Sequence, residues 1–208
     1  GVTLVEGVAY LLSSQLFMEV GTTLTIEAGV TIFALPPVMG GVAPAIVVEP
    51  GAKIRAEGTS AKPITMTTLL AEASLDDPSV VVTDSTTAAG QATTLGKTGK
   101  WGGLILLGNA PTNVATSTEI EGITGKTYGG SDPADSSGVL QYVRVWHGGA
   151  IVGADNEING ITFGGVGSGT VVDHCEVAYN ADDGFECAAM PPRVKPRAAL
   201  VVPLPPRD

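Results

Sequence analysis

The carboxylates between the two cysteines of the chain are the first residues whose types suggest chemistry. Asp182, Asp183 and Glu186 lie in the stretch CEVAYNADDGFEC, residues 175–187. Paired carboxylates can act as general acid and general base when their surroundings separate their pKa values. Asp182 and Asp183 are therefore candidate catalytic residues. The alternative is an acidic turn, in which Asp side chains accept hydrogen bonds from nearby backbone N–H groups.

Oxygen ligands suited to Ca²⁺ occur in two turns of the sequence. Asp155 and Glu157 lie in the first, and Asp182, Asp183 and Glu186 lie in the second. If the turns belong to neighbouring coils of a repeating fold, their carboxylates could converge on one Ca²⁺ ion. The spacing matches no EF-hand loop, so Ca²⁺ is a candidate cofactor inferred from residue type alone.

Histidines and cysteines offer a second set of metal or redox candidates. His147 and His174 are the only histidines, and a zinc site would need both beside carboxylates. Cys175 and Cys187 could form a disulfide, as in a secreted protein, or remain reduced, with Cys175 as a small core residue. The sequence leaves both cysteine states open.

Three aromatic residues are candidates for carbohydrate binding. Trp101, Tyr128 and Trp146 could form a surface on which sugar rings stack, because aromatic faces pack well against apolar ring faces. Packing at the edges of structural repeats is the alternative for all three.

Short apolar segments must position these candidates. LTIEAGVTI (24–32) aligns with IVVEPGAKI (46–54) at an offset of 22 residues, and GVLQYVRVWHGGA (138–150) aligns with VVDHCEVAYNADD (171–183) at an offset of 32. Each unit alternates apolar and polar residues and includes a turn, which is typical of strands. A period of about 20–25 residues with two short strands per period predicts a β-solenoid whose stacked coils share an apolar core.

Individual strands follow from the same alternation. Ile64 and Met66 are expected to point inward, and WGGLILLGNAPTN (101–113) is expected to contain a continuous apolar strand. In the 32-residue alignment His174 corresponds to Tyr142 and His147 to Tyr179, so the two histidines occupy different registers. This difference weakens a zinc site.

Several consecutive motifs resemble one protein family. GTTLTIEAGVTI, GKWGGLILLGNAPTN, GVLQYVRVWHGGA and NEINGITFGGVGSGTVVDHCEVAYNADDGFE are similar to segments of secreted right-handed parallel β-helix proteins with the pectin-lyase-like superfold, found in bacteria and algae. The resemblance covers nearly all of residues 4–186. It implies an all-β, right-handed parallel β-helix, a surface or secreted location and no assigned reaction.

The polygalacturonases offer a narrower comparison. Their adjacent Asp pair followed by Gly resembles Asp182, Asp183 and Gly184. The family also requires an upstream Asn-Thr-Asp and a downstream Gly-His-Gly and Arg-x-Lys. Here the upstream match is absent, 24 residues follow Gly184, and no cationic subsite for a uronate can be identified. The resemblance therefore gives little support for catalysis.

Two segments depart from the coil pattern. Residues 69–100, rich in Ala, Ser, Thr and Asp, are expected to be an insertion that leaves the β-helix domain of residues 1–187. Residues 188–208 contain six prolines, which cannot donate to a central sheet ladder. This Pro-rich tail is expected to be extended or to cap the last coil.

The charge balance limits the partners. The net charge is -10, and the only clustered basic residues lie in the tail. This balance disfavours nucleic acid and anionic lipid, and no apolar run is long enough to span a membrane. The expected function is an extracellular structural or surface-display module that contacts polysaccharide or matrix components. Two alternatives remain: a polysaccharide lyase or hydrolase, and a fibre subunit formed by end-to-end self-association. The shortage of basic residues outside the tail argues against an enzyme.

Overall fold

The computed structural model describes residues 1–37, 41–69, 98–116, 118–153, 156–188 and 199–202, with backbone alone for 151–153, 156–157 and 199–202. Most of the expected insertion, residues 70–97, lies outside this part of the chain. The described chain is almost entirely strand and turn. No helix within it is long and apolar enough to cross a membrane.

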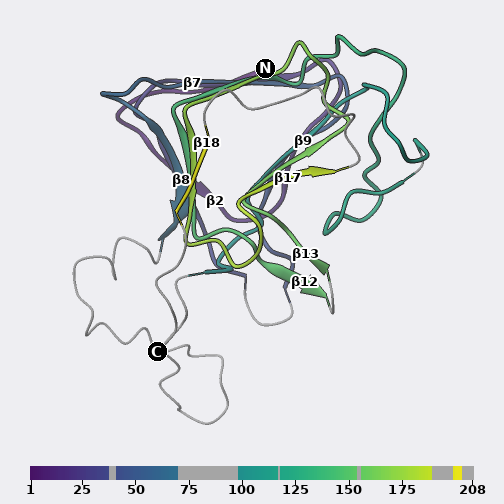
Figure 1. The fold of residues 1–208 in the computed structure, drawn as a ribbon. Helices are drawn as coiled ribbons and strands as arrows, with labels where there is room; N and C mark the ends of the chain where they lie inside the picture. The colour runs from purple at the N-terminus through teal and green to yellow at the C-terminus, as the bar shows by residue number, and fades with distance from the viewer. Residues whose placement is uncertain (38–40, 70–97, 117, 154–155, 189–198, 203–208) are drawn as a thin grey trace.

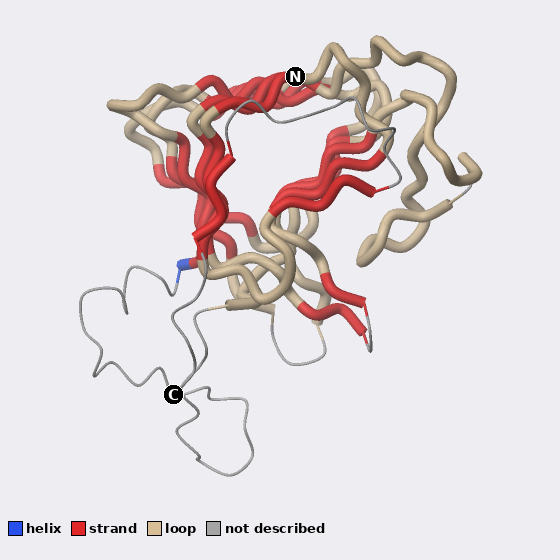
Figure 2. The backbone as a smooth tube through the Cα atoms, in the orientation of Figure 1, coloured by secondary structure: helices blue, strands red, loops and turns tan. Residues whose placement is uncertain are grey.

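The strands form three parallel sheets that face one another as the sides of a triangle (Figure 2). Each coil of the chain adds one strand to sheet A, one to sheet B and one to sheet C, in that order. The fold is therefore a right-handed parallel β-helix, as the sequence predicted.

The strands of each sheet stack in coil order (Figure 1). Sheet A contains β1 (Val2–Leu4), β4 (Thr23–Ile26), β7 (Lys53–Glu57), β10 (Gly138–Gln141) and β15 (Val171–Asp173). Sheet B contains β2 (Ala9–Leu12), β5 (Thr31–Ala34), β8 (Ile64–Thr68), β11 (Val143–Trp146), β16 (Cys175–Ala178) and β18 (Ala199–Val202). Sheet C contains β3 (Leu16–Met18), β6 (Ile46–Val48), β9 (Leu104–Leu107), β14 (Ile161–Gly164) and β17 (Phe185–Ala188). An antiparallel hairpin, β12 (Ile151–Gly153) and β13 (Asn156–Glu157), leaves the fourth coil.

One of the two sequence alignments gives the true register. Val145 pairs with Val177, which confirms the offset of 32 between the fourth and fifth coils. Leu24, however, pairs with Ile54 in sheet A, whereas Ile46 lies in sheet C and pairs with Leu104. The offset of 22 between residues 24–32 and 46–54 was therefore wrong as a coil register.

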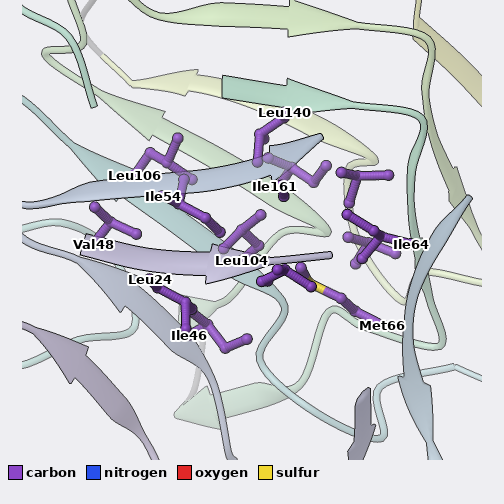
Figure 3. Close-up of a cluster of buried hydrophobic side chains, with 14 of the residues drawn as sticks. Leu24, Ile46, Val48, Ile54, Ile64, Met66, Leu104, Leu106, Leu140 and Ile161 are labelled. Carbon is purple, nitrogen blue, oxygen red and sulfur yellow. The ribbon is translucent and has the colours of Figure 1, made fainter. Parts of the chain in front are cut away.

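Alternate residues of the strands whose side chains the structure describes in sheets A, B and C point into the interior, which is mostly aliphatic (Figure 3). Ile64 and Met66 are fully buried there, as predicted, and stack on Val143 and Val145 of the next coil. Burying an aliphatic side chain of this size contributes about 1.5–3 kcal/mol, so the continuous column is the main source of stability.

Single aromatic residues make the sharpest corners between sheets A and B. Tyr142 and His174 each form a corner alone, with φ of 48° and 51°. A left-handed backbone costs a non-glycine residue about 1–2 kcal/mol. The two rings stack at 4.6 Å between centroids, and this contact offsets part of the cost.

The tail contributes one strand to the helix. β18 pairs in parallel with β16, with Cys175 opposite Ala199, and forms the last strand of sheet B. It falls in the proline-free segment 197–202, so no residue in it lacks a backbone donor. These four residues thus continue the coil pattern of sheet B, and an extended or capping tail for the rest of residues 188–208 stays a prediction.

Candidate functional site

The acidic turn after β16 is held to the preceding coil through its backbone. The Asn180 side-chain amide donates to the carbonyl oxygens of Asp182 (3.1 Å) and Asp183 (2.7 Å). The Asp183 carbonyl also accepts a bond from the N–H of Gly160. Both Asp side chains are exposed. Asp182 and Asp183 therefore stabilise the turn through their backbone. Their carboxylates are exposed to solvent and are not arranged as a catalytic pair.

Glu186 is positioned differently from the Asp pair. It lies on the outer face of sheet C, half-buried, and accepts a bond from the Asn159 side-chain amide at 2.9 Å. Burial raises the pKa of the Glu186 carboxyl above its usual range, the carboxylates of Glu121 and Asp182 raise it further, and hydrogen bonds from Asn159 and Thr162 oppose the shift. Both charged groups that shift this pKa are carboxylates, and each disfavours the ionised form of Glu186.

The two acidic turns predicted to bind Ca²⁺ belong to the same corner of successive coils. The connection with β12 and β13 precedes β14, and the turn with Asp182 and Asp183 precedes its neighbour β17. Asp155 lies outside the described residues, as does the side chain of Glu157. Among the described side chains, no group of three or more His, Cys, Asp or Glu is placed to hold a metal ion. Convergence of all five carboxylates stays a prediction.

Two of the three aromatic candidates are buried, which corrects the predicted sugar-stacking surface. Trp101 is fully buried inside the helix, where its Nε1–H donates to the Trp146 carbonyl at 2.9 Å. Tyr128 is only 5% exposed and its ring packs against Gly164, where a Cβ would approach the ring to 2.9 Å. Neither ring has a face open to a ligand.

A loop between β9 and β10 explains the burial of Tyr128. Residues 108–137 lie beside the outer side of sheet C (Figure 1). Their apolar side chains form a second hydrophobic cluster with outward residues of the sheet and its corners. The cluster contains Ala45, Val47, Ile105, Leu107, Ile120, Ile123, Tyr128 and Ile158. This face of the β-helix is therefore closed by the chain itself over strands β6 and β9.

Sequence comparison agrees with this geometry. A profile of the pectate-lyase-like β-helix domain family matches residues 1–188. The chain belongs to this family. No curated protein and no solved structure gave a match. The family assignment points to a carbohydrate-related or surface role, and the finer function has to be argued from the residues.

Both cysteines of this pectate-lyase-like domain are free thiols, so the structure has the reduced one of the two states that the sequence left open. Cys175 is buried in sheet B and Cys187 is exposed on the last described strand of sheet C. Burial raises the pKa of Cys175 to about 11, which leaves it protonated and unreactive near neutral pH. Cys175 is thus a small core residue, the alternative that the sequence had left open.

The histidines of the domain lie in two separate ring ladders. His174 stacks on Tyr142, and His147 stacks on Tyr179 at 4.9 Å between centroids. His147 is 2% exposed, and the His174 imidazole Nδ1 lies 2.9 Å from the Asp173 carboxylate. The different registers expected from sequence are confirmed, and the two imidazoles do not share a site.

Trp146 is the one aromatic candidate that reaches the surface. It lies on the outer face of sheet B, half-buried, beside Arg144 and Glu176. Its Nε1–H donates to the Glu176 carboxylate at 2.9 Å, and the Arg144 guanidinium lies 5.6 Å from its ring centroid. Sequence reasoning missed the Trp146–Glu176 and Asn159–Glu186 contacts, because neighbouring coils bring together residues about 30 positions apart.

Proposed function

We propose that this domain is a non-catalytic structural module of the extracellular surface, which presents its loops and outer faces to polysaccharides or matrix components. The observation that carries this proposal is the closure of the outer face of sheet C by the loop of residues 108–137. A polysaccharide-cleaving β-helix needs an open face with converging acid and base groups. On sheet C, the face that carries Glu186 and borders the turn with Asp182 and Asp183, side chains of the chain itself fill the middle.

The positions of the carboxylates support the same proposal. The backbone of Asp182 and Asp183 anchors their turn while their side chains are exposed, and Glu186 lies on the neighbouring strand β17. An acidic chain with a net charge of -10 also repels anionic polymers. An extracellular location fits the family assignment and is itself part of the proposal.

A polysaccharide lyase or hydrolase is the second candidate, and Glu186 is the observation that favours it. A half-buried carboxyl with a raised pKa is the form in which general acids occur. In such an enzyme Glu186 would donate the proton to a leaving oxygen. The enzymatic candidate therefore predicts that the protein cleaves a glycan and needs Glu186 to do so. The structural candidate predicts no cleavage.

Activity assays separate the two candidates. The purified protein is incubated with pectate, alginate, xylan and β-glucan, with and without Ca²⁺, and reducing ends and unsaturated products are measured. We expect no product above the level given by the Glu186→Gln and Asp183→Asn variants. Depolymerisation by the wild-type protein that either variant abolishes would replace the structural function with an enzymatic one.

A further inference from the structure

The outer face of sheet B carries a row of polar side chains. Thr31 pairs with Thr65, Thr65 with Arg144, and Arg144 with Glu176, so these four residues follow one another across β5, β8, β11 and β16. All four are partly exposed. We call them the polar row.

A second row on the same face is apolar and aromatic. Leu11 pairs with Phe33, and Phe33 pairs with Thr67. Extending the register of β8 and β11 by one residue places Trp146 beside Thr67. Leu11 is 57% exposed, and Phe33 and Trp146 are half-buried. Thr67 is only 5% exposed and adds little polar surface between the two rings. We call these four residues the aromatic row.

The only charges of the polar row neutralise each other and fix the indole. The Glu176 carboxylate accepts the Trp146 Nε1–H at 2.9 Å and lies 3.7 Å from Arg144 Nε. The ring is therefore oriented before any ligand arrives, which lowers the entropy cost of binding. Because Arg144 is already paired, the polar row, all of whose residues the structure describes, has no spare cation for a carboxylated or sulfated polymer.

The spacing of the two rings suits a sugar chain. Phe33 and Trp146 lie on β5 and β11, with β8 between them. Two strand spacings give about 10 Å along the axis of the helix. This is close to the length of a disaccharide unit, so the two rings can contact alternate sugars of an extended chain. Sugar rings combine apolar C–H faces with hydroxyl edges, and the aromatic and polar rows offer these same two chemistries side by side.

We propose that the aromatic and polar rows of sheet B bind an uncharged polysaccharide that runs across the strands, parallel to the helix axis. Phe33 and Trp146 stack on sugar rings, while Thr65 and the Arg144–Glu176 pair form hydrogen bonds with hydroxyl groups. The inference rests on the proposed function only in that an extracellular domain meets such polymers. Binding does not require the absence of catalysis.

Affinity electrophoresis with soluble glycans tests this site. The purified protein migrates through gels that contain a mixed-linkage β-glucan, xyloglucan or galactomannan, with polygalacturonate as the charged comparison. We expect retardation by at least one neutral polymer and none by polygalacturonate. Phe33→Ala and Trp146→Ala should each weaken binding roughly tenfold. Trp146→Phe, which keeps a ring and loses the bond to Glu176, should lie between Trp146→Ala and the wild type.

Phe17→Ala is the matched control, because Phe17 is also a half-buried, outward-facing phenylalanine but lies on sheet C. It should bind like the wild type. The proposal is overturned if no neutral glycan binds, if polygalacturonate binds better, or if Phe33→Ala and Trp146→Ala retain wild-type affinity while circular dichroism shows the native fold. Sedimentation that reveals a dimer lost in Trp146→Ala would assign the face to a second copy and also overturn it. The cleavage assays above have an independent outcome.

Discussion

The outer faces of sheets B and C are built by the same coils, yet several described side chains on sheet B reach solvent while those at the middle of sheet C are covered. On sheet C, Ile105 and Leu107 are fully buried beneath the loop of residues 108–137. On sheet B, the outward residues of the same and the next coil include Thr65 and Arg144, which reach solvent. The difference arises from the path of the chain, because the long connection after β9 returns over sheet C.

This contrast shows that the types of the outward-facing residues in a strand indicate whether another segment covers its outer face. A strand with one solvated face alternates apolar and polar residues, and a strand buried on both faces is apolar throughout. β8 reads ITMTT, whereas β9 reads LILL and all four of its residues are buried. We therefore look for the ligand-binding surface on the outer face of sheet B, where apolar and polar residues alternate along the strands.

Shortening an outward-facing side chain of sheet C that the loop buries should cause the largest loss of stability. Ile105→Ala should destabilise the protein by about 2–4 kcal/mol, because it removes contacts in the second hydrophobic cluster and leaves a cavity. Chemical denaturation followed by circular dichroism measures the change in the free energy of unfolding.

Thr65→Ala, at an outward position of sheet B in the same coil, is the control. It should change stability by no more than about 0.5 kcal/mol. If the two substitutions lowered the free energy of unfolding equally, the loop of residues 108–137 would not form a hydrophobic core with sheet C.

Lys126 attaches the loop of residues 108–137 to the β-helix, and its substitution should cause a loss of stability of intermediate size. Lys126 Nζ lies 2.6 Å from the Glu49 carboxylate and 4.6 Å from the centroid of the Phe17 ring. Both partners of the ion pair are partly shielded from water. Lys126→Met keeps the apolar stem and should cost about 1 kcal/mol, measured by a double-mutant cycle with Glu49→Gln.

The exposed pair between Lys62 and Glu6 calibrates this result. Its side chains are 56% and 49% exposed, compared with 30% and 21% for the Lys126 pair. Lys62→Met should therefore cost less than about 0.5 kcal/mol. A coupling energy for Lys126 and Glu49 no larger than that for Lys62 and Glu6 would contradict the anchoring role.

The fold was largely predictable because its signals are local. Strand alternation, glycine turns and the 32-residue offset all follow from residues close in sequence. The offset of 22 was misleading for a physical reason. Gly29 and Gly51 both adopt positive φ, 86° and 84°, after an acidic residue, so two different corners share one local sequence. Local similarity identified a turn type and could not tell which sheets the turn joins.

The site was much less predictable because it depends on contacts between coils. Nothing near Tyr128 in the sequence shows that its loop returns over sheet C and buries the ring against Gly164. The continuous apolar run of β9 was the available sign of a covered face. In the sequence this run predicts a strand, and it does not indicate which segment covers the strand.

Glu186 marks the edge of the closed face and gives the smallest expected effect. Its pKa is raised in the folded protein, mainly by burial and then by Glu121 and Asp182. An acid with a raised pKa in the folded state contributes stability below its unfolded pKa. That stability is lost as the pH rises through the folded pKa. The wild-type protein should therefore lose this contribution between mildly acidic and neutral pH.

Glu186→Gln removes the titrating group and keeps an oxygen that can accept the bond from Asn159. The variant should be slightly more stable than the wild type at neutral pH, and the two should converge near pH 4, where a carboxyl in the unfolded chain becomes protonated, at about its usual pKa. Thermal unfolding across this range measures the difference. Glu121→Gln, which removes one repelling charge, should give a smaller gain of the same sign. If the stability difference between Glu186→Gln and the wild type did not change with pH, the half-buried carboxylate would not be repelled by its neighbours, and the edge of sheet C would be as solvated as sheet B.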